Sequence, residues 1–218
     1  KVLQNTVMNQ SEQPLEDIRV IRKLMEESSR FLSLSGLSGI IAGVVGLAGA
    51  WIAHLVIKAN NPYTDWYLRP LAGGEAGNGT VLELFGAMAI VLLVAFSAAV
   101  VFSSRKAKKS GVNAWTPVTR RMLVSLLVPL AAGGLFVLFT VKTVPANVTA
   151  ASTLIFYGVA MMSAGKFTFG EIHWLGALEV VTGLVCILLP QWTIIIWAAG
   201  FGVIHICYGL FMHLRYKG

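Results

Sequence analysis

Charged residues are scarce in this chain. Only 12% of its 218 residues are Asp, Glu, Lys or Arg, whereas 56% are hydrophobic. An ordinary soluble domain carries about 25% charged residues and roughly 45–50% apolar ones, and a soluble core of this size could not bury so much apolar surface. The composition therefore argues against an ordinary soluble domain and indicates one compact bundle in lipid.

Cysteine is almost absent as well. The only two cysteines, Cys186 and Cys207, both lie inside apolar runs. Thiols in such surroundings behave as small hydrophobic side chains. We therefore expect neither a disulfide nor a redox role for them.

Motifs that would hold a metal or a cofactor are missing too. The sequence has no HExxH, no paired cysteines and no cluster of acids that would suggest zinc or a di-iron site. It also has no Walker loop and no nucleophile elbow. Haem would need two histidines at one depth on facing helices, and His54, His173, His205 and His213 fall at unequal depths. We expect no metal and no cofactor.

Long apolar runs are what the chain does have. A spanning helix needs about 20 apolar residues, and six runs come close to that length. They cover residues 34–57, 81–102, 122–141, 148–164, 172–189 and 192–211. Residues 14–32 alternate apolar and charged positions at helical spacing. The sequence thus predicts an all-α fold in two parts: a segment 1–33 with an amphipathic helix, then a six-helix transmembrane bundle, 34–218.

The distribution of positive charge predicts the orientation. Cytoplasmic loops are enriched in Lys and Arg. With the N-terminus in the cytoplasm, every one of the 17 Lys and Arg residues except Lys58, Arg69 and Lys142 falls on the cytoplasmic side. Both termini are therefore expected in the cytoplasm. This bias also accounts for the net charge of +7 without a nucleic-acid partner.

The loop between the second and third spans holds the largest share of these positive charges. Its basic residues are Arg105, Lys106, Lys108, Lys109, Arg120 and Arg121. The first interpretation is that they fix the topology. The alternative is a binding site for anionic lipid headgroups. In either case membrane lipids are the expected partners.

The stretch RKLMEESSRFLSLSGLSG, residues 22–39, resembles the opening of a group of small, uncharacterised bacterial multi-pass inner-membrane proteins. The resemblance covers roughly the first fifth of the chain. It implies a bacterial cytoplasmic membrane. It implies no activity, and no functional residue follows from it.

The first span is rich in small residues. Ser35, Gly39 and Gly43 are spaced by four, and Gly43, Gly46 and Gly49 by three. Small residues at such spacings let two helices approach closely in lipid. We expect packing within the chain. The alternative is a homo-oligomer or a protein partner bound through this face.

Two ionisable residues inside the spans are the leading site candidates, because such groups are costly in lipid and usually have a partner. Glu179 lies about 12 Å from the inner end of the fifth span at 1.5 Å per residue. His205 lies at a similar depth in the sixth span, across a tight hairpin. We predict that the two side chains meet. They would form either a proton- or ligand-binding pair or a structural hydrogen bond.

A second polar group is expected at the inner turn between the fourth and fifth spans. It consists of Lys166, Glu171 and His173. Residues at such a turn lie near the membrane surface, where polar side chains reach water. The simplest interpretation is an ordinary interfacial cluster.

Three functions from different classes fit these patterns. The first is a non-enzymatic accessory, scaffold or sensor component, which suits the small soluble parts and the sparse buried polarity. The second is a small secondary transporter with a Glu179/His205 site. Residues 85–91 faintly resemble 175–181, as in transporters built from inverted repeats. The third is an intramembrane enzyme acting on lipid or quinone. We favour the first.

Overall fold

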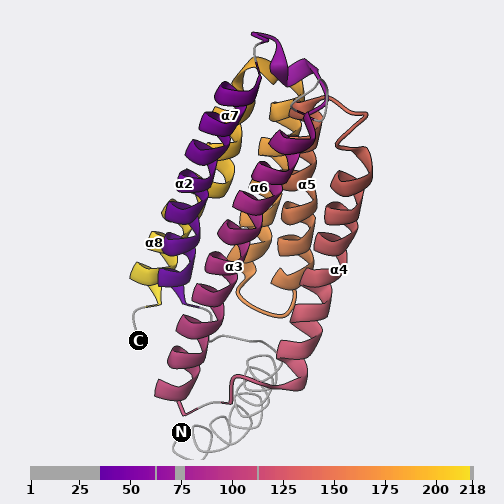
Figure 1. The fold of residues 1–218 in the computed structure, drawn as a ribbon. Helices are drawn as coiled ribbons and strands as arrows, with labels where there is room; N and C mark the ends of the chain where they lie inside the picture. The colour runs from indigo at the N-terminus through magenta and orange to yellow at the C-terminus, as the bar shows by residue number, and fades with distance from the viewer. Residues whose placement is uncertain (1–34, 62, 72–76, 112, 217–218) are drawn as a thin grey trace, which may run out of the picture.

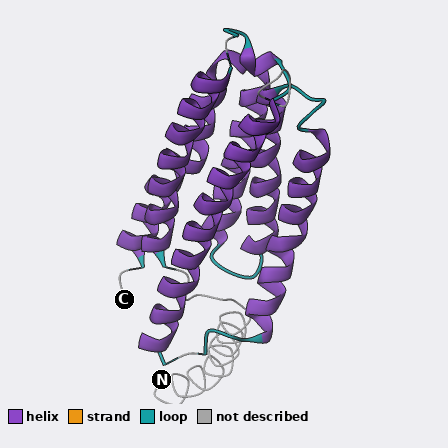
Figure 2. Cartoon of the chain, viewed as in Figure 1, coloured by secondary structure: helices purple, strands orange, loops and turns teal. Residues whose placement is uncertain are grey.

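A computed structural model describes residues 35–61, 63–71, 77–111 and 113–216 of the chain (Figure 1). Within these ranges all regular secondary structure is helical (Figure 2), as predicted. The amphipathic helix expected in residues 1–33 lies outside the described residues. The protein is an all-α bundle whose helices suit a membrane.

Among the described residues, six helical segments are long and apolar enough to cross a membrane. They are α2 (Gly36–Asn60), α3 (Gly77–Lys109), α4 (Pro117–Thr140), α5 (Ala146–Gly165), α6 (Gly170–Leu188) and a final span, Pro190–Arg215. Each covers a predicted run with shifted ends. The largest shift is in α3, whose 33 residues reach about 50 Å at 1.5 Å per residue. Hydrocarbon is only about 30 Å thick, so the ends of α3 project beyond it.

The final span is not one regular helix. It begins with a 3-10 turn, Pro190–Trp192, and continues as α7 (Thr193–Ala198), a π-helix (Ala199–Ile204) and α8 (His205–Arg215). Such π-helical turns occur often at functional sites. This one ends directly before His205, and it was not predicted.

The helices pack as a curved row. Helix α4 packs on α5, α5 on α6, α6 on α7 and the π-helix, the final span on α2, and α2 on α3. The end of α3, the start of α4 and the end of α8 lie at the bottom of Figure 1. We call this the basic end, defined by Arg105, Arg121 and Arg215. The opposite end, defined by Asn60 and Trp192, is the far end.

Local sequence explains where α4 begins. Thr116 is its N-cap and Pro117 its first residue. The Thr116 hydroxyl accepts a hydrogen bond from the Thr119 N–H at 3.2 Å, and the Thr119 hydroxyl accepts one from the Thr116 N–H at 3.4 Å. This reciprocal box satisfies two amide groups that a helix start leaves unpaired.

The glycine-rich face of α2 packs against the final span. A Cβ atom on Gly43 would lie 2.6 Å from the Gly202 carbonyl oxygen, and one on Gly39 would lie 3.0 Å from the Gly209 Cα. Only glycine allows this approach. These glycines therefore serve packing within the chain, between α2 and the final span.

Helices α5 and α6 approach each other equally closely. A Cβ on Gly158 would lie 2.5 Å from the Gly176 carbonyl oxygen, and the converse distance is also 2.5 Å. Gly183 meets α5 two turns further on, where its Cβ would lie 2.9 Å from the Ala151 carbonyl oxygen. Glu179 lies between these two glycines at helical spacing. The glycine contacts thereby turn the Glu179 side chain into the protein interior.

Candidate functional site

Glu179 is the middle residue of the 19-residue helix α6. Its side chain has no exposed surface. A carboxyl group at this depth is expensive in a membrane unless it is paired or protonated. Gly200 makes room for it, since a Cβ there would lie 2.8 Å from Glu179 Oε2. The site thus depends on the absence of a side chain at Gly200.

His205 meets Glu179, as the spacing predicts. Its Nδ1 lies 3.2 Å from Glu179 Oε1, and the histidine side chain is only 5% exposed. The same Nδ1 lies 3.0 Å from the Gly200 carbonyl oxygen. On the other side of the ring, Nε2 lies 2.9 Å from the Tyr157 hydroxyl. The imidazole therefore connects a carboxyl on α6 with a phenol on α5. We call Glu179, His205 and Tyr157 the buried triad.

Hydrogen-bond geometry limits what this contact can be. Nδ1 carries at most one hydrogen, and it is directed at Gly200, so Glu179 Oε1 is at ion-pair distance without a proper hydrogen bond. Among the described residues neither Glu179 oxygen has a hydrogen-bond partner. An isolated buried carboxylate costs several kcal/mol. The stable states are therefore a protonated Glu179 beside a neutral imidazole, or a carboxylate beside an imidazolium.

Both states fit the same heavy-atom positions. With a neutral imidazole protonated at Nδ1, Nε2 accepts a hydrogen bond from the Tyr157 hydroxyl. With an imidazolium, Nε2–H donates to the phenolic oxygen, since a tyrosine hydroxyl can donate or accept. The pair can thus hold one proton at either position with little rearrangement. Removing that proton leaves a net negative charge in a dry interior.

Aromatic rings close the far-end side of the triad. Phe201 packs against Tyr157 at 5.0 Å and against Trp197 at 4.7 Å between ring centroids. It also stacks on His205 at 6.2 Å. Trp197, Phe201 and His205 recur every four residues along the final span. Leu154, which has no exposed surface, packs beside Gly200. This apolar layer separates the triad from the far end.

The predicted cluster of Lys166, Glu171 and His173 is divided in the structure. The Glu171 carboxylate accepts a hydrogen bond from the Tyr216 hydroxyl at 2.8 Å and lies 3.5 Å from Arg215 Nη1. Within the part of the chain that is described, no ion pair joins Glu171 to Lys166 or His173. The three residues lie at the turn between α5 and α6, and Glu171 pairs there with residues from the end of α8.

The Glu171 carboxylate raises the pKa of the Tyr216 phenol, because it accepts the phenolic hydrogen. Lys166 is exposed, and His173 Nδ1 lies 3.4 Å from the Met162 carbonyl oxygen. We call Glu171, Arg215 and Tyr216 the rim cluster. It lies on the basic-end side of the buried triad.

The predicted headgroup residues gather at the basic end. Arg105, Lys106, Lys108 and Lys109 end α3, and Arg120 and Arg121 follow the start of α4. All are exposed except Lys106, which is half-buried and whose Nζ lies 5.9 Å from the Phe169 ring centre. Two basic groups from different helices thus face the same membrane surface.

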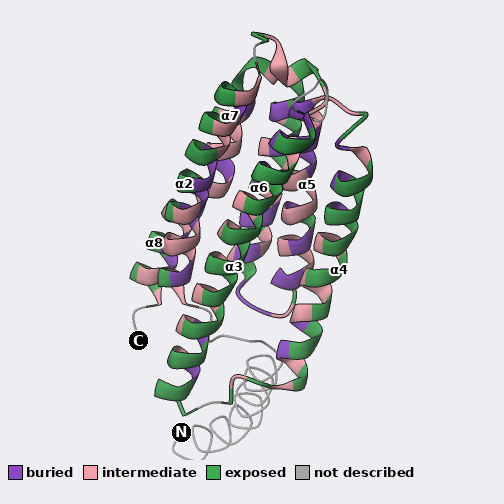
Figure 3. Cartoon of the chain, viewed as in Figure 1, coloured by how far each residue is buried: buried purple, intermediate pink, exposed green. Residues whose placement is uncertain are grey.

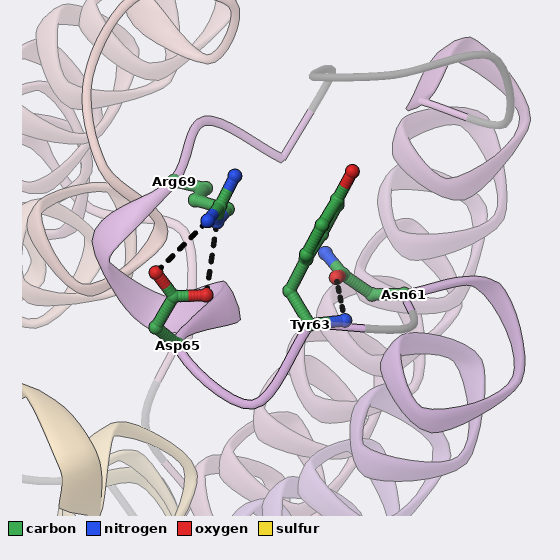
Figure 4. Close-up of polar contacts among 4 residues, drawn as sticks. All are labelled: Asn61, Tyr63, Asp65 and Arg69. Carbon is green, nitrogen blue, oxygen red and sulfur yellow. Dashed lines mark hydrogen bonds and ion pairs between the residues drawn. The ribbon is translucent and has the colours of Figure 1, made fainter.

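The far end is covered by a structured loop (Figure 4). The Arg69 guanidinium donates hydrogen bonds to both carboxylate oxygens of Asp65, at 2.9 and 3.1 Å, and lies 4.1 Å from the Tyr63 ring centre. These hydrogen bonds lower the pKa of Asp65. The Arg69 carbonyl oxygen also accepts a hydrogen bond from the Ala146 N–H at the start of α5, at 2.8 Å. This exposed ion pair fixes the loop and shows no feature of a binding site.

Three residues of the site were not predicted from the sequence. Tyr157 resembles an ordinary aromatic residue of a membrane span, and Gly200 resembles one small residue among many. Tyr216 lies 45 residues from Glu171, and no local pattern links them. Tyr157 is one of several hydroxyl residues in its span, so its hydroxyl gave no distinct signal. Within the described ranges, no three His, Cys, Asp or Glu side chains gather as a metal site would require.

Compared with protein-family models, with curated proteins and with solved structures, the chain gives no match.

Proposed function

We propose that the protein is a non-enzymatic, proton-responsive component of the bacterial cytoplasmic membrane. Its proton-binding site is the buried triad of Glu179, His205 and Tyr157. The observation that carries this proposal is a fully buried carboxyl in the middle of a span, with an imidazole 3.2 Å away. Of the accessory, scaffold and sensor roles, this arrangement supports the sensor.

The response follows from the cost of charge in a dry interior. With one proton in the pair, the triad is neutral overall and the surrounding helices pack tightly. Loss of the proton leaves an uncompensated carboxylate among α5, α6 and the final span. The π-helix before His205 is the element best suited to adjust, because its hydrogen bonding is already irregular. Binding or loss of the proton thus changes the conformation of the π-helix.

The proposed orientation in the membrane rests on the distribution of positive charge. In this proposal the basic end and both termini lie in the cytoplasm, because the Lys and Arg residues concentrate there. The bacterial membrane is proposed on the resemblance of residues 22–39. Lipids are the immediate partners, and the surface bearing Arg105 and Arg121 faces the anionic headgroups.

Infrared difference spectroscopy on the protein in lipid nanodiscs tests the proposal. A protonated carboxylic acid has a carbonyl stretch that a carboxylate lacks. We expect such a band, or the ring band of a His205 imidazolium where the proton sits on the histidine, to change between acidic and alkaline buffer, and this change to be absent in Glu179→Gln. Glu83→Gln is the matched control, since Glu83 lies near the far end and accepts a hydrogen bond from Asn60. The control should keep the band.

Hydrogen exchange measures the response itself. Amide exchange across the π-helix should speed up at alkaline pH in the wild type and remain independent of pH in Glu179→Gln, after correction for intrinsic exchange. Glu179 and His205 bands that never change with pH, or exchange that ignores it, would leave the triad as a structural hydrogen-bond network and overturn the proposal.

A secondary transporter is the second candidate function, favoured by the position of Glu179 at the centre of α6. Transporters often bind substrate near the bilayer midplane at an interrupted helix, and the final span is interrupted by its π-helix. Proton flux into vesicles distinguishes the two. A sensor exchanges a proton without net flux, whereas a transporter releases it inside and loses that flux in Glu179→Gln.

A further inference from the structure

The two approaches to the buried triad differ in chemistry. Toward the far end lie two hydroxyls: that of Thr182 on α6, which donates to the Leu178 carbonyl oxygen at 2.8 Å, and that of Thr153 on α5. The Thr153 hydroxyl donates to the Ala150 carbonyl oxygen at 2.7 Å and accepts from the Trp197 indole N–H at 3.0 Å. Both of its functions are therefore in use. Beyond it the apolar layer of Leu154 and Phe201 continues.

Toward the basic end lies Tyr208, three residues after His205 on the final span. Its oxygen is buried, yet it has no hydrogen-bond partner among the described residues. A buried hydroxyl without a partner is costly and calls for an explanation. Tyr208 thus offers an unused donor and acceptor one helical turn from the imidazole.

Tyr208 also connects the rim cluster with the triad. Its ring packs on the same apolar cluster as Tyr216, the cluster of Phe169, Ile172 and Met212. Glu171 and Glu179 are about 12 Å apart along α6 at 1.5 Å per residue, too far for direct transfer. On the final span, Tyr208 lies in sequence between His205, which contacts Glu179, and Tyr216, which contacts Glu171.

We propose that protons reach the Glu179–His205 pair from the basic end only, along Glu171, Tyr216 and Tyr208. This inference rests on the proposed proton-binding function and adds its direction. A proton from water enters at the rim cluster. Each hydroxyl on the way releases its own proton as it accepts another, so Tyr216 and Tyr208 end neutral, and the triad passes from a net negative charge to neutral.

The other groups around Glu179 do not offer a second route. Helix α5 presents Tyr157, and α8 presents His205 and Tyr208. Helix α7 and the π-helix carry no titratable residue. On α6 itself, Glu171 and His173 both lie toward the basic end. The titratable neighbours of Glu179 on these packed helices are thus in the triad or on its basic-end side, apart from the thiol of Cys186, which is fully buried two turns away.

The test is a pH jump followed by time-resolved infrared spectroscopy of the Glu179 or His205 band, in nanodiscs. Tyr208→Phe removes one oxygen and keeps the ring. We expect protonation to slow by about 100-fold, the lower end of what a positioned proton donor contributes, while the final extent of protonation stays the same. Tyr216→Phe and Glu171→Gln should slow it as well. Thr153→Val, the matched change on the far-end side, should leave the rate unchanged.

Direction is tested in vesicles with a buffered interior. Trypsin added outside cuts the α3–α4 loop only in molecules whose basic end faces outward. The fraction of molecules cut should equal the fraction in which Glu179 responds to external pH. An unchanged rate in Tyr208→Phe, a slower rate in Thr153→Val, or a response matching cleavage at Lys58 or Lys142 would overturn the proposed path. If neither Glu179 nor His205 shows a pH-dependent band in the wild type, the proposed function itself fails.

Discussion

Helices α5 and α3 are both long and apolar enough to cross a membrane, yet their surroundings differ. Of the most apolar stretch of α5, 44% is buried in protein, against 6% for α3. Figure 3 shows exposed residues along most of α3 and α4. In α3 and α4 lipid requires little beyond length, apolar side chains and helical hydrogen bonds. In α5, α6 and the final span, single glycines and hydroxyls determine the packing.

The largest expected effect is the loss of stability when His205 is removed from the tightly packed side of the bundle. His205→Ala leaves the Glu179 carboxyl and the Tyr157 hydroxyl without their shared partner. Truncating one member of a buried pair costs roughly 3–5 kcal/mol. His54→Ala is the matched control, because His54 is exposed on α2 and contacts the Trp51 ring at 5.9 Å.

Denaturation in mild detergent, followed by circular dichroism, measures both histidine variants. We expect a large loss of unfolding free energy for His205→Ala and almost none for His54→Ala. Equal losses would mean that the buried triad contributes no more to stability than a lipid-exposed histidine.

Adding one methyl group to a glycine should change the stability differently on α5 and on α3. In Gly158→Ala the new Cβ would lie 2.5 Å from the Gly176 carbonyl oxygen, so α5 and α6 must separate. Overpacking of this kind costs about 1–3 kcal/mol. Gly86→Ala on α3 meets nothing within 4 Å and should be neutral or gain about 0.5–1 kcal/mol of helix propensity.

Thermal unfolding of the two glycine variants in one lipid mixture is the measurement. A difference in sign between them is expected. Comparable destabilisation of both would show that α3 is as tightly packed as α5, contrary to the structure.

The sequence could predict the features that lipid determines better than those that depend on packing within the protein. The six spans were predictable because hydrocarbon thickness dictates their length. Their ends were not, since a helix continues into water where no residue stops it, as α3 does from residue 102 to Lys109. The Glu179–His205 contact was predictable because lipid leaves an ionisable side chain few alternatives to a partner.

The remainder of the site depends on contacts between distant parts of the chain. Tyr157 reaches His205 across 48 residues, and hydropathy contains no information about which face of α5 turns toward α8. The π-helix changes the phase of the final span, which an assumption of regular helix misses. Glu171 was assigned to its neighbours in sequence, whereas Tyr216 and Arg215 arrive from the end of the chain.

At the water-exposed rim the effects should be smaller and depend on pH. The hydrogen bond to Glu171 raises the pKa of Tyr216 in the folded protein. It therefore stabilises the fold below the unfolded tyrosine pKa of about 10, and the stabilisation disappears as pH rises through the folded value. We expect Tyr216→Phe to lose less than about 1 kcal/mol at neutral pH and nothing at strongly alkaline pH.

A double-mutant cycle with Glu171→Gln isolates the Tyr216–Glu171 interaction. The coupling energy from denaturant unfolding should be positive at neutral pH and decline toward zero in alkali. A coupling that persists unchanged in alkali would attribute the effect of Tyr216 to packing on Phe169, whose ring lies 4.6 Å away, and not to its hydroxyl.

The smallest effects belong to α3 and α4, where lipid replaces protein as the partner. The exposed basic residues at the end of α3 and the start of α4 should attract anionic headgroups by about 1 kcal/mol per charge. Arg121→Gln should therefore weaken enrichment of phosphatidylglycerol around the protein, measured by native mass spectrometry from mixed-lipid nanodiscs. The loss should shrink at high salt, because exposed charges are screened. Arg69→Gln is the control, since Arg69 pairs with Asp65 at the far end. If both variants lose the lipid equally, net charge rather than the basic end determines the enrichment.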